Sequence, residues 1–383
     1  MTLRRHGRAP TLEDTAGVTT LELFFDLVFV FALTRLTTVV RDASGPADLV
    51  QAALVLIVLW WMYDGYAWMT NNVATASTSR RILVLLGMSA FLIAAIAVPG
   101  AFGPDGVIFG AAYLSMVLIH GGLFTQAQSR QSARAIFQIL PFNVGMALLV
   151  LAAGWAHAWL DYVLWGAAVG LIVTAMTRRV ESSFELRPAH FAERHGLIII
   201  IALGESVVDL GIGAEGRLHD AATVITALLG LALAAALWWL YFDRDDEAGA
   251  RALGGTSEAG RTRTALFAYS IGVLVMVAGI VVTAAGLETA VAHPHHHLPT
   301  WAAWALPSGV AVYLVGLALF RRLLALPGAA GRLLAVVPVL ACAVLGLTVD
   351  GATEIGVLTA VVAATAVLDS RRTPNAAVLP GAR

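Results

Sequence analysis

Three ionisable residues lie within the first long apolar segment of the chain, residues 20–40. A charge near the middle of a membrane helix costs about 2.5–3.5 kcal/mol, so Glu22, Asp26 and Arg35 should face protein or water rather than lipid. Glu22 and Asp26 are four positions apart and share one face of a helix. Arg35 falls on the opposite face from Asp26. The two carboxylates could pair with neighbouring helix ends and arginines such as Arg194, or they could line a path for a cation or proton.

A second group of carboxylates lies halfway along the chain. Glu205 and Asp209 are also four positions apart, and Gly204 beside them would let another helix or a ligand approach closely. Asp64 and His120 are two further ionisable residues inside apolar segments. Ionisable residues in such segments commonly mark ion or proton pathways, so all four are candidates for a transport site.

The remaining histidines, among them His195 at the cytoplasmic start of the span 190–212, give weaker signals. His195 can titrate near neutrality, although a hydrogen bond at a helix end is the simpler role. A histidine-rich stretch could bind zinc, copper or nickel. No acidic or cysteine partner stands at ligand spacing, so we expect a loop without metal. The stretch consists of His293, His295, His296 and His297. The single cysteine, Cys342, excludes an intrachain disulfide. No cofactor site is predicted.

The composition places these residues in an integral membrane protein. The 383 residues are 59% hydrophobic and 13% charged, whereas a soluble domain carries about 25% charged residues. The net charge of −1 argues against nucleic acid as a partner. The lipid bilayer is the expected partner. A span needs about 20 mainly apolar residues, which predicts twelve at 20–40, 49–69, 81–99, 106–124, 135–153, 157–176, 190–212, 221–242, 264–287, 301–320, 332–349 and 353–368.

The arginines predict the orientation. With both termini in the cytoplasm, nearly all arginines outside the spans fall on the cytoplasmic side, as the positive-inside rule requires. The expected location is therefore the cytoplasmic membrane. The longest connection, residues 241–263, is predicted to be a charged, glycine-rich linker.

The two halves of the chain resemble each other. Two pairs of segments can be aligned. One pair is WWMYDGYAW (60–68) with WWLYFD (238–243), and the other is FALTR (31–35) with IALGE (201–205). We therefore predict two parallel six-helix repeats, related by an axis along the membrane normal. The boundaries are a tail 1–19, repeats 20–176 and 190–368 joined by a linker 177–189, and a tail 369–383.

The same alignment bears on Arg35. It sets Arg35 and Glu205 at equal depth, where an ion pair across the pseudo-symmetry axis is geometrically available. The alternative is that Arg35 extends to the outer interface.

The runs ELFFDLVFVFALTRL (22–36) and ERHGLIIIIALGESVV (193–208) resemble the bacterial low temperature requirement A family. The resemblance covers nearly the whole chain and implies a multi-pass membrane protein. Its motif falls here on Glu22, Phe24, Phe25, Asp26, Arg194, His195, Gly196, Gly204 and Glu205. The first run also resembles the pore-lining Phe-Ser-Asp helix of a class of potassium-selective channels, although Phe25 stands where they have Ser and Gly196 aligns with Asp26.

These observations favour a transporter or channel for a small ion, either a monovalent cation or a proton. One alternative is an intramembrane enzyme acting on a lipid, with Asp26 and Glu205 as acid and base within about 10 Å of each other. The other is a non-catalytic membrane protein of stress adaptation whose charges only organise packing. The sequence leaves open whether the chain forms a homodimer.

Overall fold

The computed structural model describes residues 17–73, 77–127, 129–181 and 184–372, and this part of the chain is helical with no strand. Twelve of its helices are long and apolar enough to cross a membrane. The predicted all-α architecture with about twelve spans is thereby confirmed. Most of the predicted tails, and residues 182 and 183 of the predicted linker, lie outside the described residues.

The first half of the described chain consists of the first six long helices. They are α1 (Thr20–Arg41), α2 (Pro46–Asn72), α3 (Thr78–Ala97), α4 (Gly106–Phe124), α5 (Arg130–Ala153) and α6 (Trp159–Glu181), with a short 3₁₀ helix η1 (Val98–Gly100) after α3. A capping box starts α1, because the Thr19 side chain accepts from the Glu22 amide and the Glu22 carboxylate accepts from the Thr19 amide. The carboxylate of Glu22 therefore has a fixed place before any contact with the second half.

The second half begins with α7 (Pro188–Ala214) and α8 (Ala221–Phe242). It continues with α9 (Asp245–Gly255), α10 (Glu258–Thr264), a π-helix η2 (Ala265–Ile271), α11 (Gly272–Ala292), α12 (Thr300–Leu323), α13 (Ala329–Ala341), α14 (Ala343–Thr348) and α15 (Gly351–Arg372). The prediction of a linker over 241–263 is wrong, because α9 and α10 occupy most of it. Three acidic residues in the first turn of α9 and an ion pair between Glu247 and Arg251 stabilise this helix.

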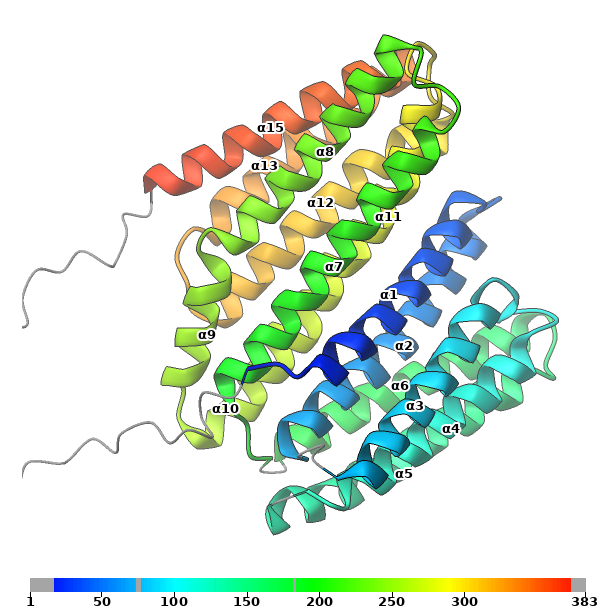
Figure 1. Cartoon of the computed structure of the whole chain (residues 1–383), viewed down its shortest axis with the longest axis vertical. Helices are drawn as coiled ribbons and strands as arrows, with labels where there is room; N and C mark the ends of the chain where they lie inside the picture. Colours follow the sequence, from blue (N-terminus) through cyan, green and yellow to red (C-terminus); the bar gives the residue numbers. More distant parts are fainter. Residues whose placement is uncertain (1–16, 74–76, 128, 182–183, 373–383) are drawn as a thin grey trace, which may run out of the picture.

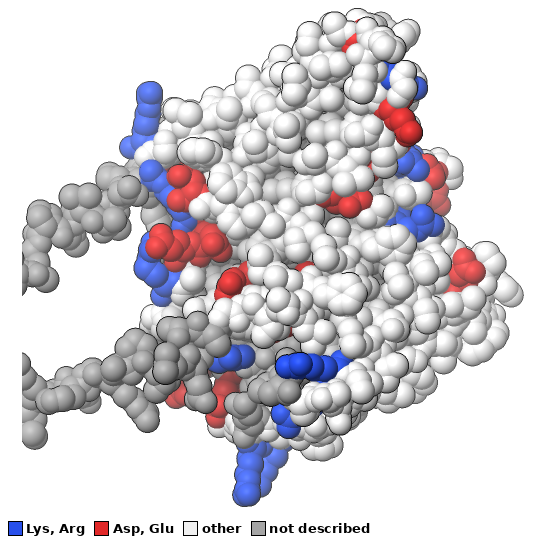
Figure 2. Space-filling view, in the orientation of Figure 1, with Lys and Arg blue, Asp and Glu red and all other residues white. Residues whose placement is uncertain are grey.

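The two halves lie side by side, with α1 and α2 of the first half next to α7 and α11 of the second (Figure 1). We call the side of the bundle on which α1 begins and α9 lies the α9 side. Figure 2 shows charged side chains mainly along two opposite edges of the molecule, with a broad band of few charges between them. This distribution is expected of a protein whose middle faces lipid.

One hydrogen bond recurs in both halves. Tyr113 of α4 donates to the carbonyl of Val58 in α2, at 2.9 Å. Tyr313 of α12 donates to the carbonyl of Leu237 in α8, at 3.0 Å. In each half the fourth span is thus bonded to the second by a buried tyrosine. The recurrence favours the predicted duplication, which remains a prediction.

Candidate functional site

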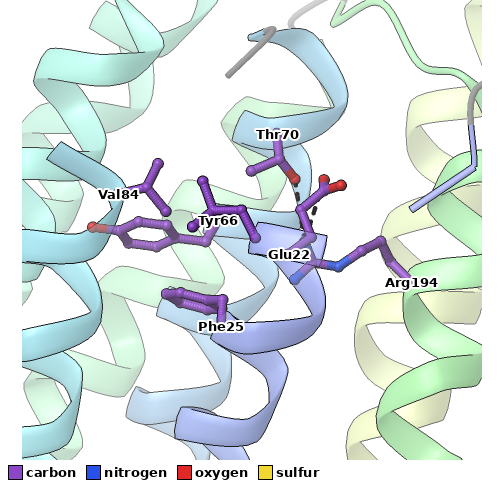
Figure 3. A pocket seen from close by; sticks show the side chains of 7 residues that line it. Glu22, Phe25, Tyr66, Thr70, Val84 and Arg194 are labelled. Atoms are coloured by element: carbon purple, nitrogen blue, oxygen red, sulfur yellow. Dashed lines mark hydrogen bonds and ion pairs between the residues drawn. The ribbon is translucent and has the colours of Figure 1, made fainter. Parts of the chain in front are cut away.

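Arg194 of α7 joins the two halves through the carboxylates of α1. Its Nη2 lies 2.6 Å from Asp26 Oδ1, and its Nη1 lies 3.3 Å from Glu22 Oε1. All three side chains are buried, with Asp26 0% and Arg194 1% exposed. Figure 3 shows Glu22 and Arg194 pointing toward one another across the contact between α1 and α7. The predicted alternative of a pairing with Arg194 is therefore realised in the structure.

Helix α2 supplies the remaining contacts of this pair. Tyr63 donates to Asp26 Oδ1 at 3.2 Å, and the guanidinium of Arg194 lies over the Tyr63 ring, 5.9 Å from its centroid. Thr70 accepts a bond of 3.4 Å from Arg194 Nη1. The ring of Phe29 stacks on Tyr63 at 4.3 Å between centroids. The carboxylate of Asp26 thus has aromatic rings beside it rather than further oxygen ligands.

The hydrogen bonds of Asn71 determine the protonation of His190. Asn71 Oδ1 accepts from the Arg187 amide, so its Nδ2 is the donor to the Arg187 carbonyl and to His190 Nδ1. His190 Nδ1 must then accept, and the proton of the neutral ring sits on Nε2, which lies 3.3 Å from Glu22 Oε2. His190 is therefore a neutral donor to Glu22.

We call Glu22, Asp26, Tyr63, His190 and Arg194 the interhalf cluster. With His190 neutral, the cluster buries two carboxylates against one guanidinium and has a net charge of −1. Asp26 Oδ2 is buried and has no hydrogen-bond partner among the described residues. A buried charge without compensation is costly, so the cluster should take up one positive charge, and Asp26 Oδ2 is the vacant position for it.

A second polar contact joins α2 and α7 at the adjoining residues. His195 Nε2 lies 3.3 Å from Asp64 Oδ1, and both side chains are fully buried. His195 Nδ1 lies 2.9 Å from the Phe191 carbonyl, which can only accept, so this nitrogen carries a proton. The contact with Asp64 then requires a second proton, held either by the imidazole or by the carboxyl group. Asp64 and His195 therefore hold one proton between them in this contact.

The π-helix η2 supplies a further hydrogen bond to Asp64. Ser270 donates to Asp64 Oδ1 at 2.8 Å, while its carbonyl accepts from Trp60 at 2.6 Å. π-helical segments are rare and are often found at functional sites.

A pocket reaches the interhalf cluster between α1, α2 and α3. Its empty volume is about 230 Å³, and it is lined by Leu21, Glu22, Phe25, Tyr66, Thr70, Val84 and Arg194 (Figure 3). It reaches Glu22 and Arg194 without including Asp26 or Glu205 among its lining residues.

Comparison with known proteins identifies the chain. Residues 17–367 match the family model described as Bacterial low temperature requirement A protein (LtrA). The chain belongs to the LtrA family. A relative from Rhizobium meliloti (strain 1021), named Uncharacterized protein RA0937, is 30% identical over 288 residues, which is 72% of this chain and 69% of the relative. No solved structure matches. The protein is therefore a multi-pass membrane protein of a bacterial family.

A third group of charges in this LtrA protein lies toward the other end of α7. Asp209 is 4% exposed, and its Oδ2 has no hydrogen-bond partner among the described residues. Its electrostatic neighbours are Glu205, Glu288 and Arg41. Arg41 of α1 bonds to Glu288 of α11 at 2.6 Å, which leaves Glu205 and Asp209 without an arginine. Toward this end, too, carboxylates outnumber their cations.

The expected ion pair between Arg35 and Glu205 is absent from the described part of the chain. Both residues are half-buried, and neither has an ion pair or hydrogen bond. The arginine of α1 that does reach the second half is Arg41, six positions further along, and its partner is Glu288 rather than Glu205.

Several other motif residues have local roles. His120 lies 3.0 Å from the Gly65 carbonyl and packs beside Tyr66 and Phe124. Phe25 is buried and stacks on Tyr66, whereas Phe24 is 52% exposed on the outside of the bundle.

The two motif glycines differ. Gly204 is exposed, and no atom of another described element lies within 4 Å of the position its Cβ would take, so no helix approaches closely there and the approach of a ligand stays a prediction. The close approach occurs at Gly196, where an added Cβ would lie 3.0 Å from Asp246 Oδ1.

The histidine-rich loop lies on the surface of the protein. All four histidines are exposed, and His295 lies 3.5 Å from Asp220. Among the described residues, no group of three or more His, Cys, Asp and Glu side chains could hold a metal ion.

Our sequence analysis missed a second buried ion-pair network, which we call the second-half cluster: Asp245, Arg321, Arg332 and Asp369. Arg321 binds both oxygens of Asp245, at 2.7 and 3.1 Å, and Arg332 lies 2.5 Å from Asp245 Oδ2. Asp369 accepts from both arginines at 2.7 to 2.9 Å. Asp245 falls in the supposed linker and Asp369 in the supposed tail, so neither was considered as an intramembrane group.

Proposed function

We propose that this LtrA protein transports protons through the contact between its two halves. The observation that carries the proposal is the charge imbalance of the interhalf cluster, in which Asp26 Oδ2 is buried and has no partner. A proton is favoured over a metal cation because a cation needs several oxygen ligands. Around Asp26 the structure offers aromatic rings and a guanidinium instead.

Proton-binding groups follow one another along α7. The order from the α9 side is Arg194 with Asp26, then His195 with Asp64, then Glu205 and finally Asp209. The 15 residues from Arg194 to Asp209 cover about 22 Å at 1.5 Å per residue, which is most of a bilayer core of about 30 Å. Chains of carboxylates and histidines form proton relays in membrane proteins. Here water would have to bridge the ten residues, about 15 Å, between His195 and Glu205.

The burial of these groups favours a carrier, or the closed form of a channel, over a permanently open pore. Asp26, Asp64 and His195 are all 0% exposed. Proton movement would therefore require a rearrangement that opens the contact between α1, α2 and α7 to water. The alternative of a lipid enzyme has no support in this geometry, because the pocket beside Glu22 includes neither Asp26 nor Glu205.

Proton flux into liposomes tests the proposal. The purified protein is reconstituted with a trapped pH-sensitive dye, and a potassium diffusion potential is applied with valinomycin. We expect acidification faster than in empty liposomes, and its loss in Asp26→Asn, which removes the vacant carboxylate oxygen and keeps the side-chain shape. Asp161→Asn is the matched control, because Asp161 is a buried carboxylate of α6 outside this chain of groups. Flux equal to that of empty liposomes, or unchanged in Asp26→Asn, would leave only a packing role for the cluster.

A further inference from the structure

Glu354 is a buried carboxyl group that takes no part in either cluster. It lies in the first turn of α15 and is 0% exposed. Helix α15 as a whole packs against α8, α11, α12, α13 and α14. Gly346 of α14 makes room for the carboxyl group, because a Cβ at that position would overlap Glu354 Oε2.

Neither oxygen of Glu354 has a hydrogen-bond partner among the described residues. Among the described residues, no arginine or histidine interacts with it, and the titratable group beside it is the thiol of Cys342, which is itself buried. A carboxylate in such a place would be an isolated charge in an apolar interior, which is too costly to persist, so the group must carry a proton. The ion pairs that hold Asp26 and Asp245 have no counterpart at Glu354 among the described residues.

The helix that covers Glu354 is short and interrupted. Span eleven consists of α13 and α14 with a break at Cys342, and Pro338 inside α13 removes one backbone donor. Helix α14 has six residues. Its Gly346 carbonyl accepts a hydrogen bond of 2.8 Å from the amide of Leu298, which lies in the loop between α11 and α12. The element over the carboxyl group is therefore a short helix between two interruptions of the chain.

We propose that Glu354 is a proton-binding site of the second half, which holds its proton under α14 and exchanges it with water when α14 moves away. The site does not depend on proton transport at the interhalf cluster, since no residue is shared. Loss of its proton in the covered form would create an uncompensated buried charge. Release of the proton and movement of α14 are therefore coupled.

Reaction with the apolar reagent dicyclohexylcarbodiimide tests the site in the wild-type protein. The protonated carboxyl group adds across one C=N bond: its oxygen bonds to the central carbon and its proton passes to nitrogen, without any oxidant or leaving group. The adduct then rearranges to a stable acylurea that peptide mass spectrometry locates. We expect an adduct on Glu354 at neutral pH and none on Glu288, whose carboxylate is held by Arg41. Absence of the adduct on Glu354 would overturn the proposal, because the group would then be ionised or permanently covered.

The variant Glu354→Gln provides an independent measurement. The amide has the shape of the protonated carboxyl group and no charge, so we expect a melting temperature in detergent equal to that of the wild type. A much lower melting temperature, or failure of the variant to fold, would show that an ionised Glu354 has a partner, and would overturn the proposal. Asp26→Asn should retain the Glu354 adduct, which separates this site from the interhalf cluster.

Discussion

The interhalf cluster and the second-half cluster use the same kinds of side chain and balance their charges differently. The second-half cluster has two aspartates and two arginines, and every carboxylate oxygen lies within 3.1 Å of a guanidinium nitrogen. The interhalf cluster has two carboxylates and one arginine, and Asp26 Oδ2 has no partner among the described residues.

The difference in charge balance indicates that the second-half cluster is a packing contact and that the interhalf cluster is a site for a proton. The second-half cluster joins α9, α12, α13 and α15 within one half, and its charges balance without any group from outside. The interhalf cluster lies where the two halves meet, and its missing positive charge must come from outside the protein. Neutralising one aspartate should therefore destabilise the second-half cluster. The interhalf cluster should tolerate the same change.

The largest effect is expected for Asp245→Asn. The substitution leaves Arg321 and Arg332 buried with Asp369 as their shared carboxylate, so one positive charge is uncompensated. Breaking a buried network in this way costs about 3–5 kcal/mol of unfolding free energy. Thermal or denaturant-induced unfolding in detergent measures the loss. A change below 1 kcal/mol would mean that the network is solvated and that the comparison fails.

An intermediate effect is expected for Tyr63→Phe. The ring remains stacked on Phe29, but the donor to Asp26 Oδ1 is lost, which should cost about 1 kcal/mol of unfolding free energy. Tyr313→Phe is the matched control, because it removes one buried donor to a backbone carbonyl. Only Tyr63→Phe should also change the proton flux in liposomes. Equal flux in both variants would remove Tyr63 from the proton path.

The smallest effect on stability is expected for Asp26→Asn. The substitution leaves Glu22 and Arg194 as a neutral pair and removes the surplus charge, so the unfolding free energy should change by less than about 1 kcal/mol. The same unfolding experiment compares it directly with Asp245→Asn. A loss as large as that of Asp245→Asn would show that both clusters are packing contacts.

The sequence predicts the spans of this protein well because a membrane requires long apolar helices with their backbone bonds satisfied internally. The length of each apolar run is enough to locate α1 to α8, and the charges within α1 are enough to make Asp26 a candidate. The helices α9 and α10 could not be predicted from hydropathy, since buried ion pairs replace apolar contacts in this segment.

The pairing of Asp64 with His195 could not be predicted for a different reason. Helix α2 is buried continuously from Leu59 to Val73, so no apolar stripe indicates which face meets α7. The rotation and tilt of two such helices follow from packing, which single-sequence patterns do not contain. Glu354 was missed because an acid in the first turn of a helix is ordinary, and only the structure shows that this one is buried.

The infrared absorption of protonated carboxyl groups at neutral pH tests the central claim most directly. The claim is that the surplus negative charge of the interhalf cluster is neutralised by a proton on Asp26. The carboxylic acid absorption of the wild type should lose one component in Asp26→Asn and keep that component in Asp161→Asn, while the band of protonated Glu354 remains in both variants. A wild-type spectrum that Asp26→Asn leaves unchanged would mean that Asp26 is ionised, and it would contradict the account.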